Sequence, residues 1–174
     1  LSDDCMVLED GVTSSGAIFR YIESVAPGSF FRSGGSSLGW AMGAAMGARL
    51  AAPDRVPVAL VGDGSFLFSP PVASLCAADK HRAPYLTVIF NNGAYGAPRR
   101  TVRSYYAEGY SVMSKDFASS ELDPSPDYAL IAKACRAYGE TVTEPDQVLP
   151  ALRRGLDEVR SGRAAVLDVH LERP

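Results

Sequence analysis

The sequence predicts an α/β fold, a three-layer sandwich in which helices cover both faces of a central, mostly parallel sheet. Apolar runs alternate along the chain with segments of helical periodicity, which is typical of strand–helix–strand units. Several of these runs are apolar at nearly every position, as in parallel strands that are buried on both faces. The length of 174 residues suits a single domain, so we assign residues 1–174 to one unit.

The first half of the chain is expected to contain two buried strands and three helices. The predicted strands are 5–8 and 56–62, and the predicted helices are 13–25, 40–52 and 71–81. Pro27 and Gly28 end the first helix, and Pro71 suits the first turn of the third. The glycine-rich segment 30–39 is predicted to be a flexible turn. Gly39, Gly43 and Gly47 are spaced four apart, which indicates a helix face pressed against another backbone.

The second half begins with a strand and a long segment without clear periodicity. Strands are predicted at 85–91, 140–143 and 164–171, and helices at 126–139 and 145–162, with Gly139 closing the first of these helices. Residues 93–126 are rich in Gly, Ser, Tyr and charged side chains. A segment of that length without periodicity is more typical of a functional loop than of a connection.

Composition excludes several classes of function. The net charge of −3 offers no basic surface for nucleic acid or for an anionic membrane, and no apolar segment is long enough to span a bilayer. Three widely spaced cysteines indicate a reducing, cytoplasmic compartment and are each expected to be small buried apolar residues. Two histidines are too few for a Cys/His metal cluster.

Polar residues follow two of the predicted strands where each strand ends. Gly62, Asp63 and Gly64 follow the first, and Asn91 and Asn92 end the second. Ligands bind at the carboxyl ends of strands in open parallel sheets, so these residues predict a site. A dinucleotide-binding fingerprint lacks its third glycine here, and a phosphate-binding Gly-Lys-Ser/Thr loop is absent. An isolated Asp-Gly is most often a simple turn.

A magnesium-anchored phosphate site accounts for both polar strand ends. Asp63 supplies a carboxylate oxygen, Asn92 an amide oxygen, and the turn after Asn92 a carbonyl, all of which are suitable ligands for Mg²⁺. Gly62 and Gly64 allow the backbone to approach a ligand, and Gly64 and Ser65 can offer N–H groups to phosphate. Asn91 is expected to brace the turn from the opposite side of the strand.

Gly-Asp-Gly followed after a spacer in the high twenties by Asn-Asn resembles the thiamine diphosphate motif. The chain is similar over nearly its whole length to the C-terminal diphosphate-binding domain of thiamine diphosphate-dependent decarboxylases and carboligases, such as acetolactate synthase and benzoylformate decarboxylase. The spacer is slightly longer than is usual, which we place as an insertion around "SPPV". The resemblance implies the thiamine diphosphate-binding fold with a flavodoxin-like topology.

The resemblance also assigns roles to individual residues. It implies metal coordination by the side chains of Asp63 and Asn92 and by the carbonyl of Ala94. The residues that it places beside the diphosphate are Thr13, Ser14, Gly64, Ser65, Tyr95 and Gly96. Leu38 matches the apolar residue that bends the cofactor, and the Ser36 carbonyl matches the acceptor for the cofactor's amino group.

The implied activity is decarboxylation or carboligation of a 2-oxo acid with thiamine diphosphate and Mg²⁺. The activating glutamate is expected on a separate pyrimidine-binding domain or subunit, so no catalytic residue is assigned in this chain, and Glu9 is taken as an ordinary surface or loop residue. We therefore expect a homo- or hetero-oligomer, and a chain that is inactive by itself. The alternatives are a fragment of a longer polypeptide, the small subunit of a split decarboxylase, a non-catalytic assembly module, and a nicotinamide-binding domain.

Overall fold

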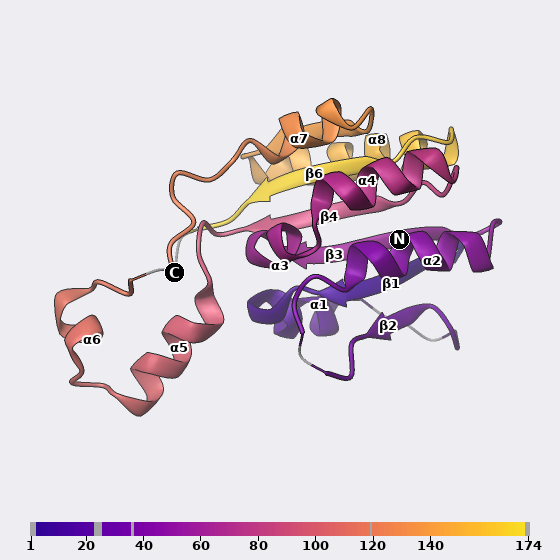
Figure 1. Cartoon of the computed structure of the whole chain (residues 1–174). Coiled ribbons are helices and arrows are strands. Elements are labelled where there is room, and N and C mark those ends of the chain that lie inside the picture. The colour runs from indigo at the N-terminus through magenta and orange to yellow at the C-terminus, as the bar shows by residue number, and fades with distance from the viewer. Residues whose placement is uncertain (1–2, 23–25, 36, 119, 173–174) are drawn as a thin grey trace.

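A single six-stranded sheet forms the centre of the computed structural model, which describes residues 3–22, 26–35, 37–118 and 120–172. All neighbouring strands are parallel, in the order β2-β1-β3-β4-β6-β5 (Figure 1). Their bounds are β1 Cys5–Asp10, β2 Phe30–Arg32, β3 Val56–Gly62, β4 Leu86–Asn91, β5 Tyr138–Val142 and β6 Ala165–His170. The predicted α/β sandwich is confirmed, with a sheet that is wholly parallel.

Helices cover both faces of this sheet. On one face lie α2 (Ala41–Ala51), α4 (Pro71–Lys80) and α7 (Tyr128–Ala134); on the other lie α1 (Ser15–Tyr21) and α8 (Val148–Arg160). The remaining elements are α3 (Asp63–Phe68), α5 (Gly96–Tyr105), α6 (Tyr110–Ser114) and two short 3-10 helices, Val12–Ser14 and Pro145–Gln147.

The two apolar layers follow from the alternation of side chains along each strand. In β3, Ala59 and Val61 join the cluster under α2, α4 and α7, whereas Val58 and Leu60 join the cluster under α1 and α8. All four side chains are buried. Because both faces are covered, the strands are apolar at nearly every position, which is the pattern that predicted them.

The strand order also determines where a ligand can bind. The order 2-1-3-4 agrees with a flavodoxin-like sheet, but β6 enters between β4 and β5, so the last two strands are exchanged. The chain leaves β1 for one side of the sheet and β3 for the other, and this change of direction opens the carboxyl ends of β1, β3 and β4 to a ligand.

Two segments predicted to lack regular structure contain short elements. Phe30–Arg32 is a strand because it pairs with β1, yet it lies half-exposed at the sheet edge and has no apolar run to reveal it. Within 93–126 the helices α5 and α6 form an arm that projects beyond the strand ends (Figure 1). Its first helix includes Gly96 and Pro98, which are weak helix formers.

The helix predicted at 126–139 ends at Ala134, and Gly139 does not close it. Gly139 lies in β5, where a Cβ atom would be 2.1 Å from the carbonyl oxygen of Ala129 in α7. The glycine is therefore required because a helix crosses the strand closely there. Arg136, at φ 64°, adopts the left-handed conformation between the two elements.

Three smaller expectations need correction. Only Gly39 of the predicted glycine row touches another backbone; it precedes α2, and a Cβ atom at Gly43 or Gly47 would meet nothing within 4 Å. Helix α1 ends at Tyr21, short of the predicted boundary at residue 25, which lies outside the described residues. Cys76 is exposed rather than buried.

Among the described residues, no helix has the length and apolar character needed to cross a bilayer.

Candidate cofactor and metal site

Asp63 stands at the carboxyl end of β3, where it begins α3. Its side chain is 3% exposed. Its Oδ1 accepts the N–H of Gly64 at 2.9 Å, and its Oδ2 accepts the N–H of Gly93 at 2.8 Å. Burial raises the pKa of the Asp63 carboxyl above its usual value, against these hydrogen bonds, which lower it. The carboxylate thus joins the end of β3 to the turn after β4.

That turn carries the other two predicted metal ligands. The Oδ1 of Asn92 accepts the N–H of Ala94 at 3.0 Å, which holds the amide against its own turn. The carbonyl of Ala94 accepts the N–H of Gly96 at 3.0 Å and retains a second lone pair. The structure therefore brings Asp63, Asn92 and Ala94 to one place, with Gly93 between them.

The predicted diphosphate residues gather beside this turn. Thr13, Ser14, Asn92 and Gly96 line a cavity of about 380 Å³. A Cβ atom at Gly96 would lie 3.0 Å from Cγ2 of Thr13 and 3.6 Å from Nδ2 of Asn92, so the absence of a side chain there keeps the space narrow but open. The 3-10 helix Val12–Ser14 and the start of α5 thus meet at the strand ends.

Arginines of α5 complete the wall of the same cavity. Arg99, Arg100 and Arg103 all line it. Arg99 is buried, because its Nε donates to Ser120 at 2.8 Å and its Nη2 pairs with Glu121 at 2.7 Å. Arg99 therefore fixes the segment that returns from the arm. Arg100 and Arg103 add positive charge to the cavity wall, which also carries Glu172.

Other predicted diphosphate residues are occupied by protein contacts. The Ser65 hydroxyl donates to the carbonyl of Asp10 at 2.9 Å, so it faces β1. The N–H of Tyr95 donates to the carbonyl of Ser120 at 2.8 Å. A Cβ atom at Gly64 would lie 2.4 Å from the Tyr95 ring, so the glycine allows that ring to cover the start of α3. Gly62 is half-buried at the end of β3.

The end of β1 organises the other half of the site. Asp10 is buried and its Oδ2 accepts the N–H of Gly39 at 2.8 Å. Burial raises the pKa of the Asp10 carboxyl above its usual value. Leu38, the predicted wedge, is half-buried in the turn that Gly39 anchors. Ser36, the predicted acceptor for the cofactor's amino group, lies outside the described residues.

Glu9 is buried, so its assignment as a surface or loop residue is wrong. Its side chain is the acceptor for the Ser15 hydroxyl at 2.6 Å and for the N–H of Gly11 at 2.8 Å. Its other oxygen lies 3.3 Å from Nε of Arg32. These contacts tie β1 to α1 and to β2, beside a cavity of about 290 Å³ that Trp40 also lines.

Neither Glu9 nor Asp10 was singled out from the sequence, although a signal was present. Both residues end the first apolar run, "CMVLED", as Asp63 follows the buried strand β3. An acidic residue at the end of a buried parallel strand faces the ligand-binding edge of the sheet, which is the argument that identified Asp63.

The oxygen donors at this turn are suited to Mg²⁺, and not to a metal ion that is coordinated by protein side chains alone. In the described part of the chain no basic side chain pairs with Asp63, and no group of three or more His, Cys, Asp or Glu residues could hold an ion. The available donors are one carboxylate, one amide oxygen and one carbonyl. Mg²⁺ commonly takes one or two carboxylates and fills its octahedron with water and phosphate oxygens.

Comparisons with known proteins identify the family of the chain. Residues 10–169 match the family model described as thiamine pyrophosphate enzyme, C-terminal TPP binding domain. The chain is 34% identical over 174 residues to the acetolactate synthase large subunit IlvG of Mycobacterium tuberculosis, and covers 29% of it. It is 30% identical over 151 residues to the sulfoacetaldehyde acetyltransferase of Alcaligenes xylosoxydans xylosoxydans, covering 23% of that protein.

Solved structures share the fold. The thiamine diphosphate-dependent 4-hydroxybenzoylformate decarboxylase of Rhodococcus jostii RHA1 superposes with a TM-score of 0.84 at 23% identity, over 99% of this chain and 30% of that one. Benzoylformate decarboxylase of Polynucleobacter necessarius gives 0.78 at 21% identity, over 99% and 31%. The chain thus spans between 23% and 31% of the length of these relatives. It belongs to the family of C-terminal thiamine pyrophosphate-binding domains of thiamine pyrophosphate enzymes.

Proposed function

We propose that this chain binds Mg²⁺ and the diphosphate of thiamine diphosphate as one half of the active site of a 2-oxo acid decarboxylase or carboligase. The observation that carries the proposal is the convergence of Asp63 and Asn92 on one turn. Asp63 reaches that turn from β3 through Gly93, and Asn92 and Ala94 lie on it. Three oxygen donors of the kind that Mg²⁺ prefers are thereby gathered at the carboxyl edge of the sheet.

The residues of the chain would hold the cofactor rather than react with it. Asp63, Asn92 and the Ala94 carbonyl would bind the metal, which in turn would bind the diphosphate. Thr13 and Ser14, which line the cavity together with Asn92, would contact the diphosphate. Leu38 would hold the bent shape of the cofactor, since Gly39 and Asp10 fix its turn. When bound, thiamine diphosphate supplies the electron sink for cleaving a 2-oxo acid.

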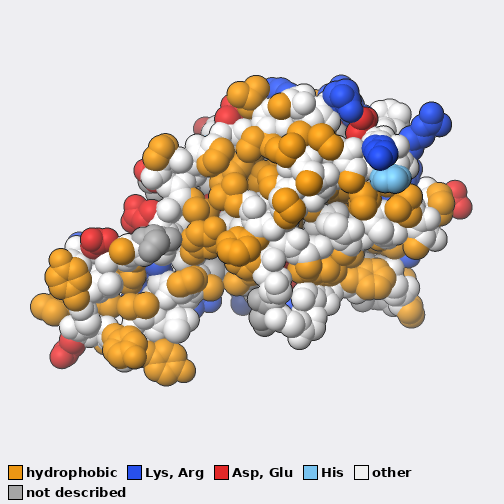
Figure 2. Space-filling view, in the orientation of Figure 1, with side chains coloured by type: hydrophobic (Ala, Val, Ile, Leu, Met, Phe, Trp, Pro, Cys, Tyr) orange, Lys and Arg blue, Asp and Glu red, His pale blue; other side chains and the backbone are white. Residues whose placement is uncertain are grey.

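We further propose that residues 1–174 form one diphosphate-binding domain that works with a pyrimidine-binding domain or subunit within an oligomer. Exposed apolar side chains support this arrangement (Figure 2). Tyr105, Tyr110 and Met113, on the arm, are between 76% and 81% exposed. Phe68, at the end of α3, is 59% exposed. Apolar surface of this kind is typical of regions that another protein covers.

Calorimetric titration of the chain with thiamine diphosphate, with and without Mg²⁺, tests the proposed site. We expect binding that requires the metal, and we expect Asp63→Ala to weaken it by about 1.5–3 kcal/mol, as for loss of a charged contact. That loss corresponds to a change in Kd of roughly 10- to 150-fold. Unchanged affinity of Asp63→Ala would show that Asp63 is not a ligand.

A reconstitution experiment separates the catalytic half-site from a non-catalytic assembly module. The chain is mixed with a pyrimidine-binding half, and release of carbon dioxide from 2-oxo acids is followed. Turnover that depends on both parts and on thiamine diphosphate is the expected result. An assembly that forms but never turns over 2-oxo acids would favour the assembly module.

A further inference from the structure

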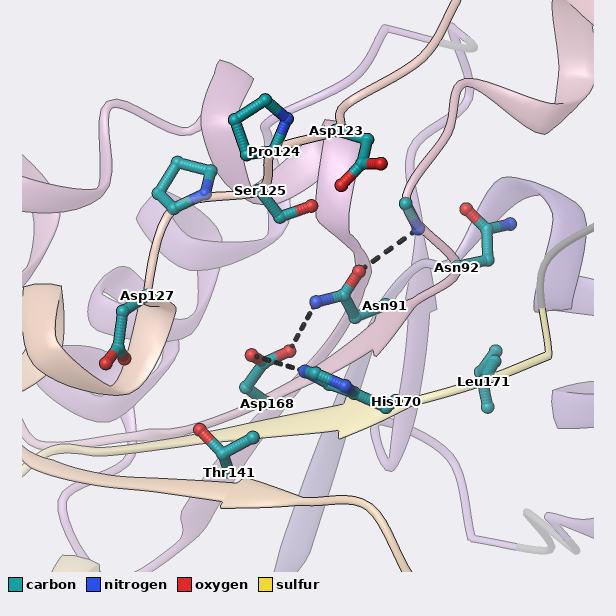
Figure 3. Close-up of a pocket in the computed structure, with 12 residues that line it drawn as sticks. Asn91, Asn92, Asp123, Pro124, Ser125, Asp127, Thr141, Asp168, His170 and Leu171 are labelled. Atoms are coloured by element: carbon teal, nitrogen blue, oxygen red, sulfur yellow. Dashed lines mark hydrogen bonds and ion pairs between the residues drawn. The ribbon is translucent and has the colours of Figure 1, made fainter.

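A second cavity lies on the other side of the turn that carries Asn92 (Figure 3). It has a volume of about 450 Å³ and opens between the carboxyl ends of β4, β5 and β6. Three polar side chains on its wall, Asn91, Asp168 and His170, are joined by hydrogen bonds. Asn91 ends β4, and the other two residues belong to β6, the last strand of the chain.

These residues form a continuous chain of contacts that reaches Asp63. His170 Nε2 lies 3.2 Å from Asp168 Oδ2, and Asp168 Oδ1 accepts Nδ2 of Asn91 at 2.9 Å. The Oδ1 of Asn91 accepts the N–H of Gly93 at 3.1 Å. That same N–H donates to Oδ2 of Asp63 at 2.8 Å. The backbone N–H of Gly93 is therefore shared between the Asn91 side chain and the Asp63 carboxylate at the proposed metal site.

Asp168 determines the orientation of the Asn91 amide. An amide can present either its oxygen or its nitrogen to a neighbour, but an ionised carboxylate can only accept. Asp168 therefore selects the orientation of Asn91 in which Nδ2 points to β6 and Oδ1 points to Gly93. Asp168 is 3% exposed and Asn91 is 7% exposed, so water does not readily replace either partner.

Asp168 is well fixed in its own position. β4 and β6 are paired along their whole length, and the N–H of Leu171 donates to the carbonyl of Asn91 at 2.7 Å. The side chain of His170 is 46% exposed, so it is the outermost and least constrained member. The rigid pair is therefore Asn91 and Asp168.

We propose that Asn91 and Asp168 are positioning residues for the metal site. They hold the turn 92–94 so that Asp63 and Asn92 present their oxygens to the same ion. Neither residue touches the metal or the cofactor. This inference rests on the proposed function, because it requires that the turn bind a metal.

Exchange of the two side chains tests the inference. Asn91→Asp alone places two carboxylates 2.9 Å apart across the former hydrogen bond, and they repel one another. The double variant Asn91→Asp/Asp168→Asn reverses donor and acceptor. Its new amide at position 168 donates to the new carboxylate at position 91, which still accepts the N–H of Gly93. Asp168→Asn alone keeps an acceptor beside Asn91 but no longer selects the orientation of the amide.

The measurement is Mn²⁺ binding to the chain assembled with a pyrimidine-binding half, in the presence of thiamine diphosphate, followed by electron paramagnetic resonance. Mn²⁺ suits the same oxygen ligands as Mg²⁺. We expect Asn91→Asp to raise the half-saturating Mn²⁺ concentration at least about tenfold, which corresponds to about 1.4 kcal/mol. The double variant should return to within about threefold of the unmodified chain. Thr141→Val, which changes a side chain of the same cavity outside the network, should leave Mn²⁺ binding unchanged.

Thermal unfolding of every variant separates positioning from simple stability. If Asn91→Asp lowers Tm but leaves Mn²⁺ binding unchanged, or if the exchange restores Tm and not Mn²⁺ binding, the inference is overturned while the proposed function stands. If the unmodified chain, assembled with a pyrimidine-binding half, binds no Mn²⁺ with the cofactor, both proposals fail. Rescue of Mn²⁺ binding by the double variant supports the inference when Asn91→Asp is still folded at the temperature of the binding measurement, because its weaker Mn²⁺ binding is then due to the altered contact and not to unfolding.

Discussion

Two buried carboxylates, at the ends of the neighbouring strands β1 and β3, each hold a turn by accepting one glycine N–H, but the two turns carry different side chains. Asp10 accepts the N–H of Gly39 and Asp63 accepts the N–H of Gly93, each at 2.8 Å. Both glycines have positive φ, 88° and 69° respectively, a conformation that favours glycine. In each case a carboxylate at the end of a buried strand fixes a turn that arrives from elsewhere in the chain.

The difference lies in the residue before each glycine. Leu38 precedes Gly39 and presents an apolar side chain, whereas Asn92 precedes Gly93 and presents an amide oxygen. In the proposed site, the first turn would therefore contribute an apolar wall and the second a polar one. The comparison indicates that the hydrogen bond between carboxylate and glycine determines where a turn lies, while a single neighbouring side chain determines its chemistry.

The largest effect that we expect from this comparison is on stability, at Gly39. A Cβ atom there would lie 2.6 Å from the backbone carbon of Phe68, in addition to the strain of positive φ. We expect Gly39→Ala to lower the free energy of unfolding by about 2–5 kcal/mol, by adding overpacking to conformational strain. Urea denaturation measures this change. A loss below about 1 kcal/mol would mean that the turn moves freely and that Asp10 does not fix it.

The next effect separates the two carboxylates by function. We expect Asp10→Ala to weaken cofactor binding by releasing the turn of Leu38, without changing the dependence on Mg²⁺. Asp63→Ala should weaken the Mg²⁺-dependent part by about 1.5–3 kcal/mol. Titrations with thiamine diphosphate at several Mg²⁺ concentrations distinguish the two. Equal loss of Mg²⁺ dependence in both variants would contradict the assignment of the metal to the Asp63 turn and of the apolar contact to the Asp10 turn.

A smaller effect is expected at Gly93, where strain is the only cost that we invoke. Gly93→Ala should lower the free energy of unfolding by about 1–2 kcal/mol, because an L-residue pays this cost in the left-handed region. Comparison with Gly39→Ala by the same denaturation experiment sharpens the contrast between a turn packed on backbone and one held by hydrogen bonds. A larger loss at Gly93 than at Gly39 would contradict it.

The smallest expected effect concerns the charge itself. Burial raises the pKa of Asp10 and of Asp63 above the ordinary value of 3.8, so the folded state binds the proton more tightly than the unfolded state. Proton binding by these two carboxyls stabilises the folded state fully below pH 3.8, and this stabilisation is lost as the pH rises through each raised pKa. Asp63→Asn should therefore raise Tm at neutral pH, by about 2–4 °C for each kcal/mol, and this gain should fade in acid.

A matched variant completes this test. Asp10→Asn should show a similar gain in Tm, yet only Asp63→Asn should lose Mg²⁺-dependent cofactor binding. Thermal scans at neutral and acid pH, together with Mg²⁺ titrations, measure both properties. A lower Tm for Asp63→Asn at neutral pH would show that its hydrogen bonds, rather than its buried charge, dominate its effect on stability.

The site residues that were predicted without the family resemblance share one property: each lies at the end of a strand with a continuous apolar run. Asp63 and Asn92 follow β3 and β4, and these strands are apolar because helices cover both faces. Asp168 escaped the prediction because it lies inside an apolar strand, where a lone acidic residue carries no periodic signal. Its partner Asn91 is 77 residues away in the chain, so only the pairing of β4 with β6 reveals the contact.

Local sequence determined the α/β class, the main strands and helices, and the polar residues at the strand ends, because periodicity and Gly-Asp-Gly are properties of neighbouring residues. Tertiary structure alone decided the rest. It inserted β6 between β4 and β5, added β2 at the sheet edge, assigned Gly139 to a strand crossing and buried Glu9 against Arg32. These features depend on contacts between distant segments, whose free energy is set by burial and hydrogen bonding in the folded chain rather than by local preference.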